Sequence, residues 1–222
     1  MLHMQHFHRL VLVLWLTVFS LPLQNAFGFA GLKFEDVFQS NKEPNFMHFK
    51  VEVQSNGTHQ LEVWRSGGVK IKRVTDGVLE TFAVRKNKDD DFYLSVLDLK
   101  RKIHTQINRT NLIRIGNFSD WFDLGHGLKH PLGEYDLVKI ASAPSDAPAT
   151  KDCQWYALTQ NSQTTSICWS TKAHLPLVIQ NAQGQALWKI SAWDSKPIDE
   201  SAFVIHDEGF VKNNANEDID HD

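Results

Sequence analysis

Short segments in which apolar and polar residues alternate follow one another through most of the chain. From Met47 to Gln54 every second residue is apolar, which is the period of a strand that buries one face and exposes the other. The turn sequences Asn56-Gly57, Ser66–Gly68 and Asp76-Gly77 separate this segment from the next ones, and such residues favour the positive φ angles of tight hairpins. The pattern predicts a mainly β protein of about ten antiparallel strands.

The alternation stops near Asn108, and a helical pattern extends from there to Pro131. Asn108 and Ser119 are residue types that cap helix N-termini. The apolar residues that follow Ser119 have the spacing of one helix face: Trp121, Leu124 and Leu128. We therefore expect short helices, inserted between the strands, that cover the sheet as a lid.

Strands resume after this insert, and we expect them at Tyr135–Ala141, Leu175–Gln180 and Gln185–Trp193. Some strands, such as Phe92–Leu97, are apolar on both faces. Such strands favour a single sheet with helices against one side over a sandwich of two sheets, in which one strand face normally meets water. Because long flat edges invite aggregation, we predict a strongly curved antiparallel sheet, an incomplete barrel, with the helical lid inserted mid-chain.

The first 30 residues have the pattern of a secretory signal peptide. Arg9 precedes the apolar run Leu10–Leu23, and small residues follow between Ala26 and Ala30. The run is shorter than the roughly 20 residues that a membrane-spanning helix needs. We expect cleavage within residues 26–30 and export to an oxidising compartment. An uncleaved membrane anchor is the alternative.

The rest of the chain is long enough for one domain, which we expect to span residues 31–210. Residues 211–222 are rich in Asn, Asp and Glu, so we expect a disordered acidic tail there. The formal net charge is −3. This mildly acidic balance argues against binding to nucleic acid and against electrostatic attachment to an anionic membrane.

Cys153 and Cys168 are the two cysteines of the chain. If Gln160 and Asn161 form a two-residue hairpin turn, the two cysteines lie directly opposite one another. In an exported protein this arrangement predicts a structural disulfide. A redox-active pair usually has CxxC spacing, and a zinc site needs more ligands nearby.

Asp123, His126 and His130 are the best candidates for enzyme chemistry. On one continuous helix they share a face and suit a divalent metal ion. However, a zinc-protease helix carries Glu directly after its first His, and Gly127 stands at that position here. The chain also lacks a G-x-S-x-G sequence and a Gly-rich phosphate loop. We expect no enzyme activity, no metal and no cofactor.

LEVWRSGGVKIKRVTDG, residues 61–77, and FYLSVLDLKRKIHTQI, residues 92–107, are two successive strand pairs in the alternating pattern. They resemble the early strand pair and the next hairpin of the periplasmic carriers that sort lipoproteins to the outer membrane, the LolA-like family. Residues 168–194 resemble its closing strands, which include a Leu-Pro sequence and a glycine turn. The resemblance extends over most of residues 34–206 as an order of elements, without an invariant motif.

The resemblance implies an apolar cavity between the curved sheet and the lid. In the family an arginine of the early strand hydrogen-bonds to the backbone of the lid helices, and Arg65 matches that position. By the strand period, Arg65 shares a face with Leu61 and Val63, so its guanidinium needs acceptors from the lid or from an anionic ligand. Alternatively, Arg65 reaches water at the strand end. Trp121 and Phe122, on the lid, are further ligand-binding candidates.

The resemblance therefore implies a soluble, monomeric periplasmic carrier or binding protein. Its partner would be a lipid, an acylated protein or another apolar ligand held on the concave face of the sheet. One alternative is an envelope stress sensor or a scaffold that binds other envelope proteins. Another is a metal-dependent hydrolase that uses the Asp123, His126 and His130 set.

Overall fold

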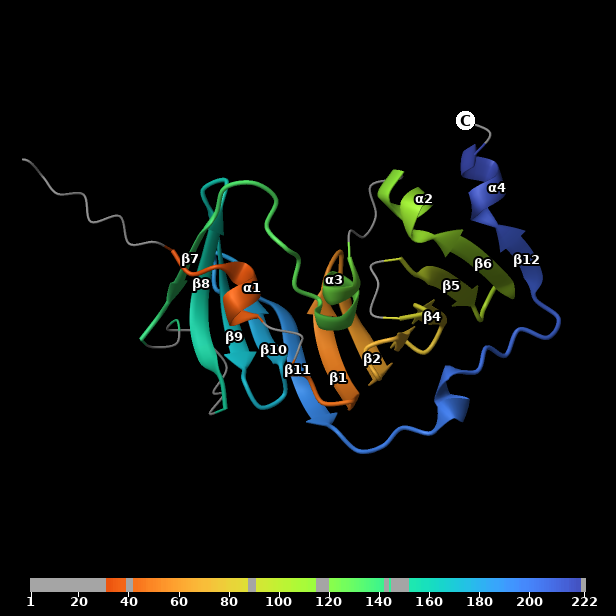
Figure 1. Cartoon of the computed structure of the whole chain (residues 1–222), viewed down its shortest axis with the longest axis horizontal. Coiled ribbons are helices and arrows are strands. Elements are labelled where there is room, and N and C mark those ends of the chain that lie inside the picture. The colour runs from red at the N-terminus through yellow and green to blue at the C-terminus, as the bar shows by residue number, and fades with distance from the viewer. Residues whose placement is uncertain are drawn as a thin grey trace, which may run out of the picture. The chain divides into compact units, whose positions relative to one another are not determined.

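The computed structural model describes residues 31–38, 42–87, 91–114, 120–141, 144 and 152–220. The predicted signal peptide, residues 1–30, lies outside this part of the chain. Within it, twelve strands form one sheet in the order β12-β6-β5-β4-β3-β2-β1-β11-β10-β9-β8-β7 (Figure 1). The strands are β1 (Phe46–Gln54), β2 (Thr58–Ser66), β3 (Lys70–Thr75), β4 (Leu79–Val84), β5 (Tyr93–Asp98), β6 (Ile103–Asn108), β7 (Asp136–Lys139), β8 (Gln154–Gln160), β9 (Gln163–Ser170), β10 (Leu175–Gln180), β11 (Ala186–Asp194) and β12 (Val211–Asn214).

The helices are short. They are α1 (Phe34–Val37), α2 (Arg109–Arg114), α3 (Trp121–His126), the 3-10 helix η1 (Glu200–Phe203) and α4 (Ala215–Asp220). No helix among the described residues has the length and apolar character needed to cross a membrane. The sheet therefore provides the framework, and the helices add cover to parts of it.

The mainly β fold that the alternation predicts is confirmed. The predicted turn residues Asn56, Gly67, Gly68, Asp76 and Gly77 all have φ between +49° and +68°, so tight turns join neighbouring antiparallel strands. The predicted strand Leu175–Gln180 is β10 with the same bounds.

The sheet is open and is not strongly curled, so the predicted incomplete barrel is wrong in that respect. β12 and β7 are its two edges. The described ladders between β1 and β6 keep a regular register, whereas shifts occur at three ladders, β1 with β11, β10 with β11 and β10 with β9. Because bulges are the main device that bends a sheet sharply, the regular half is not forced to curl.

One face of the sheet carries the main apolar core. Phe34 of α1 and Phe122 and Leu124 of α3 are buried there against strand residues such as Phe49 and Trp169. The Phe122 ring meets the Phe34 ring edge-on at 5.7 Å and lies 6.3 Å from the Trp169 ring. Aromatic packing of this kind is the main contribution that a four-residue and a six-residue helix can make to stability.

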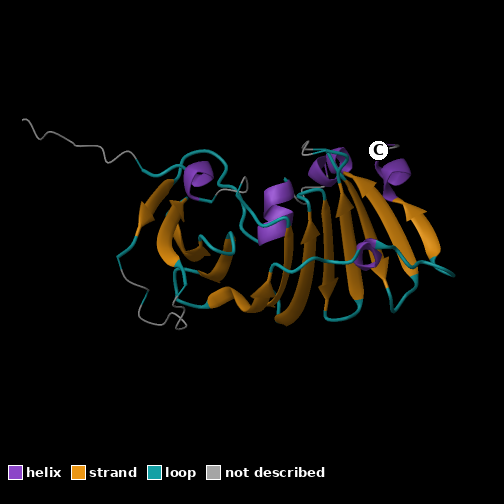
Figure 2. Cartoon of the chain, turned by 60° about the horizontal axis from the view of Figure 1, so that its bottom comes forward, coloured by secondary structure: helices purple, strands orange, loops and turns teal. Residues whose placement is uncertain are grey.

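The opposite face is crossed by residues 195–210, which we call the C-terminal strap (Figure 2). Lys70 is adjacent to Ile71 on β3, so the two side chains point to opposite faces. Lys70 forms an ion pair with Glu200 of the strap, whereas Ile71 belongs to the main core. Asp207 of the strap also places Oδ2 2.5 Å from Nδ1 of the buried His104.

The end of the chain differs from the disordered acidic tail that its composition predicts for residues 211–222. Val211–Asn214 forms β12, which pairs in parallel with β6. Ala215–Asp220 forms α4, where Asn216 Oδ1 accepts hydrogen bonds from the backbone of Asn108 and the side chain of Asn111. Backbone and amide hydrogen bonds therefore order a segment that has almost no apolar side chains.

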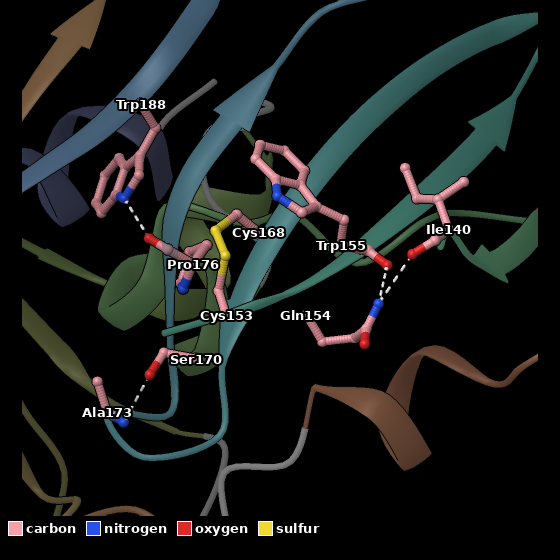
Figure 3. Close-up of a disulfide and its surroundings, with 9 residues drawn as sticks. All are labelled: Ile140, Cys153, Gln154, Trp155, Cys168, Ser170, Ala173, Pro176 and Trp188. Carbon is pink, nitrogen blue, oxygen red and sulfur yellow. Dashed lines mark hydrogen bonds between the residues drawn. A yellow bond between two sulfur atoms is a disulfide. The ribbon is translucent and has the colours of Figure 1, made fainter. Parts of the chain in front are cut away.

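Cys153 and Cys168 form the predicted disulfide, with their Cα atoms 5.4 Å apart (Figure 3). The predicted register is wrong, however, because Trp155 rather than Cys153 faces Cys168. The turn is Asn161-Ser162, where both residues have positive φ, as this tight turn type requires. The turn thus lies one residue later than predicted, and the disulfide joins the strands diagonally.

The helical insert is shorter than predicted. Asp120, not Ser119, caps α3, and Ser119 lies outside the described residues. The helix ends at Gly127, which has φ +66°, instead of continuing to Pro131. Leu128 is buried but lies beyond the end of the helix, because Gly127, in the left-handed conformation, terminates α3.

Candidate functional site

Arg65 lies near the end of β2, beneath α3, on the face that carries the main core. Its side chain is 6% exposed, and Leu61 and Val63 on the same face are buried as well. Nη1 donates to the carbonyl oxygen of Gly125 at 3.4 Å and lies 2.9 Å from Nε2 of His126. Arg65 therefore faces inward and meets a helix carbonyl instead of reaching water, and its role toward a ligand stays a prediction.

Glu43, which precedes β1, completes a buried ionic cluster with Arg65 and His126. Its Oε2 lies 3.3 Å from Nη1 of Arg65, and its Oε1 lies 2.7 Å from Nε2 of His126. Burial by itself would raise the pKa of Glu43, but the hydrogen bond to His126 and the charge of Arg65 outweigh burial and lower it. Removing either charge would leave the other buried without compensation, which is strongly destabilising.

His126 links this cluster to α3. Its Nδ1 lies 2.8 Å from the carbonyl oxygen of Phe122, so Nδ1 carries a proton and donates it. Burial, together with the charge of Arg65, lowers the pKa of His126 below its usual 6.5, although the hydrogen bond and the charge of Glu43 act in the opposite direction. Its Nε2 lies 2.9 Å from Nη1 of Arg65 and 2.7 Å from Oε1 of Glu43, so the ring joins α3 to both charged residues.

A second polar cluster closes the loop after α3. Asp120 caps the helix by accepting from the backbone N–H of Asp123 at 2.7 Å. Nδ1 of His130 lies 2.7 Å from Oδ2 of Asp120 and 3.4 Å from Oδ1 of Asp123. These two carboxylates raise the pKa of His130 to about 10. His130 is therefore an imidazolium at neutral pH and holds both carboxylates.

The ion pairs of His130 predict an alkaline loss of stability. A histidine whose folded pKa is raised stabilises the fold fully below its unfolded pKa, near 6.5, and stops doing so as the pH rises through its folded pKa, here about 10. The free energy of unfolding of the wild type should therefore exceed that of the His130→Gln variant at pH 6. The difference should shrink between pH 8 and pH 11, as measured by urea denaturation. A difference that is constant with pH would contradict the assignment.

The structure does not bring together the three residues of the alternative metal site. Asp123 and His130 lie close, but Nε2 of His126 faces Arg65 and Glu43. Asp120 takes the third place, and the ligand atoms of Asp120, Asp123 and His130 lie within 4.8 Å of one another. A metal ion would have to displace a proton from His130, whose pKa is about 10. The helix cap formed by Asp120 and the ion pairs of His130 account for the proximity of these three side chains.

The two predicted lid residues point in different directions. Trp121 packs edge-on against Phe92 at 5.7 Å, and the guanidinium of Arg85 lies 4.3 Å above its ring. Phe122 stacks on the ring of His126 at 3.9 Å and is 9% exposed. Both side chains are thus part of the packing that seats α3 on the sheet.

Sequence reasoning did not find Glu43. It lies next to Pro44, in a stretch without strand or helix periodicity. The available signal was indirect, since an arginine on a buried strand face requires an acceptor or a counter-charge, but that requirement does not say which carboxylate supplies it.

Comparisons with known proteins add little to this geometry. No protein-family model matches the chain, and no curated protein matches it. In structure it is similar to an uncharacterized conserved protein from Thermus thermophilus, with 8% identity and a TM-score of 0.47 over 77% of this chain and 91% of the other. It is also similar to MucB, with 16% identity and a TM-score of 0.36 over 76% of this chain and 60% of MucB. Neither similarity assigns the chain to a family.

Proposed function

We propose that this protein is an exported, soluble binding protein or carrier for a lipid, an acylated protein or another apolar ligand. The ligand lies on the core face of the sheet, and α3 acts as a lid that leaves the sheet to admit it. The observation that carries the proposal is the hydrogen bond from Arg65 on the sheet to the backbone of α3. The proposed activity needs no covalent chemistry.

The way in which α3 is held supports a detachable lid. The helix has six residues, one of which is Gly125, and isolated helices of this length are not stable in water. Arg65 reaches the helix through Nη1 alone, because Nε and Nη2 are buried without a hydrogen-bond partner in the described part of the chain. The helix is therefore held closed by the packing of its aromatic side chains and by a small number of polar contacts, and an element held in this way can open locally.

The surface beneath α3 suits an apolar guest. Ile71 meets Gly125 there, and Phe49, Val63 and Trp188 are buried on the same core face. Displacing the helix would expose this apolar surface, and a hydrocarbon chain would cover it again, with a favourable free energy of about 25 cal/mol per Å².

Two features support export to an oxidising compartment. The sequence of residues 1–30 predicts a signal peptide, and Cys153 and Cys168 form a disulfide. Structural disulfides form and persist outside the reducing cytosol.

Two substitutions in the lid contact should act in opposite directions. Arg65→Leu removes the hydrogen bonds to α3, so amide exchange in residues 121–127 should become about tenfold faster or more, and so should dissociation of the fluorescent apolar probe N-phenyl-1-naphthylamine. Gly125→Ala should slow both rates about fivefold, because alanine favours the helix by about 1 kcal/mol. An added Cβ at Gly125 makes ordinary contacts of 3.4–3.5 Å with Arg65 and Ile71.

Arg101→Leu is the control, since the side chain of Arg101 is 77% exposed. It should change neither rate. If Arg65→Leu and Gly125→Ala both retain the probe with wild-type kinetics, α3 is not a lid. If the wild-type protein binds no apolar probe at all, the proposed function is wrong.

A further inference from the structure

Arg73 is a second cation on the same face of the sheet as Arg65. On β3 it lies two residues from Ile71, and it pairs directly with Val63 of β2 and Thr81 of β4. Residues that pair directly in an antiparallel ladder point to the same face. Val63 and Ile71 belong to the main core, so the side chain of Arg73 starts on the core face.

The neighbours of Arg73 in its row across the sheet are uncharged. The register places Phe49, Val63, Thr81, Val96 and Thr105 in this row. Among the described residues, Arg73 has no hydrogen bond and no ion pair. Arg65, in the next row, is already paired with Glu43.

The row changes from buried to partly open along its length. Phe49 and Val63 are buried, whereas Arg73, Thr81, Val96 and Thr105 are partly exposed. The next row, on the side of α3, contains Ile71, Ala83 and Leu94, all buried. Arg73 therefore marks the border between the covered apolar surface and a partly open strip of small apolar and hydroxyl side chains.

A guanidinium at this border is poorly solvated, and no carboxylate in the described part of the chain compensates its charge. Burial lowers the pKa of Arg73 to about 10, with no acidic group acting against it. A carboxylate or phosphate binds a guanidinium through two parallel hydrogen bonds, and the hydroxyl of Thr81, directly opposite, is a further donor. The charge at this position thus favours an anion whose remaining part is apolar.

We infer that Arg73 binds the head group of an anionic single-chain amphiphile, such as a fatty acid, whose hydrocarbon tail extends from Arg73 toward Ile71 and the surface beneath α3. This inference rests on the proposed function, because the tail occupies the surface that the lid covers. The inference adds the class of ligand to the proposed function. Arg73 selects a ligand with one negatively charged head group over a ligand with an uncharged head group.

Calorimetry with matched ligands below their critical micelle concentrations tests the inference. The probes are dodecanoate, its uncharged ester monododecanoylglycerol and acetate. The wild type should bind dodecanoate about 10- to 100-fold more tightly than the ester, because charge-assisted hydrogen bonds contribute that much to the affinity. It should bind acetate too weakly to measure. Arg73→Gln should remove that preference and leave ester binding unchanged. Arg73→Lys should keep part of it, because the charge remains while the paired geometry is lost.

Arg101→Gln is the matched control and should behave as the wild type. Two results would overturn the inference without contradicting the proposed function. One is equal affinity of the wild type for dodecanoate and the ester, and the other is an unchanged preference for dodecanoate in Arg73→Gln. If acetate binds as tightly as dodecanoate, the ligand of Arg73 is a free anion and the inferred amphiphile is wrong. Binding of neither dodecanoate nor the ester would overturn the proposed function itself. The wild-type preference needs no variant and stays informative if Arg73→Gln does not fold.

Discussion

Replacing Gly127 by alanine should lower the free energy of unfolding by about 2–4 kcal/mol. Gly127 ends α3 with φ +66°, a conformation that disfavours any side chain. An added Cβ would overlap the ring of Trp188. This ring cannot turn away freely, because its Nε1 donates to the carbonyl oxygen of Pro176 at 2.9 Å in a buried site. Urea denaturation measures the loss, and amide exchange in residues 121–127 shows whether α3 detaches.

Gly77→Ala is the matched control. Gly77 has φ +68°, and no heavy atom lies within 4 Å of an added Cβ. This variant therefore carries the backbone strain alone, about 1 kcal/mol. Equal losses at the two positions would show that the contact between Gly127 and Trp188 does not hold the end of α3.

Removing the disulfide should have the second large effect. Cys153 and Cys168 are 15 residues apart, and closing a loop of this size stabilises a fold by about 3 kcal/mol in the chain-entropy model. The double variant Cys153→Ala, Cys168→Ala should lose about that much in urea denaturation. Cys168 is fully buried beside Trp155 and Val178, so a small cavity adds to the loss.

Reduction provides an independent comparison. Dithiothreitol should destabilise the wild type by a similar amount and leave the double variant unchanged. A thiol assay on denatured, unreduced protein should find no free thiols. Two titratable thiols in the purified protein would show that the disulfide does not form.

Local sequence predicted most of the hairpins. Asn-Gly, Gly-Gly and Asp-Gly pairs adopt positive φ at little cost, and the period of two assigns each strand residue to a face. These rules placed Arg65 on the same face as Val63, where the structure has it. They were less reliable where two neighbouring residues could both form a turn, as at Gln160, Asn161 and Ser162, and the hairpin register shifted accordingly.

The contacts between distant segments were beyond these rules. Glu43 meets Arg65 and His126, Asp207 meets His104, and Asn216 meets Asn108, and none of these pairs is related by a local period. The strand β12 was missed for the same reason, because it is stabilised by the backbone of β6 and not by its own side chains.

By itself the sequence determined most of the strands, which face of these strands is apolar and which two cysteines pair, because these properties depend on neighbouring residues or on composition. The tertiary structure decided how far the sheet bends, where α3 ends and which carboxylate accompanies Arg65. Those outcomes depend on atoms far apart in the chain, such as Gly127 against Trp188 and Glu43 against His126, and they are set by close packing and by the need to pair buried charges.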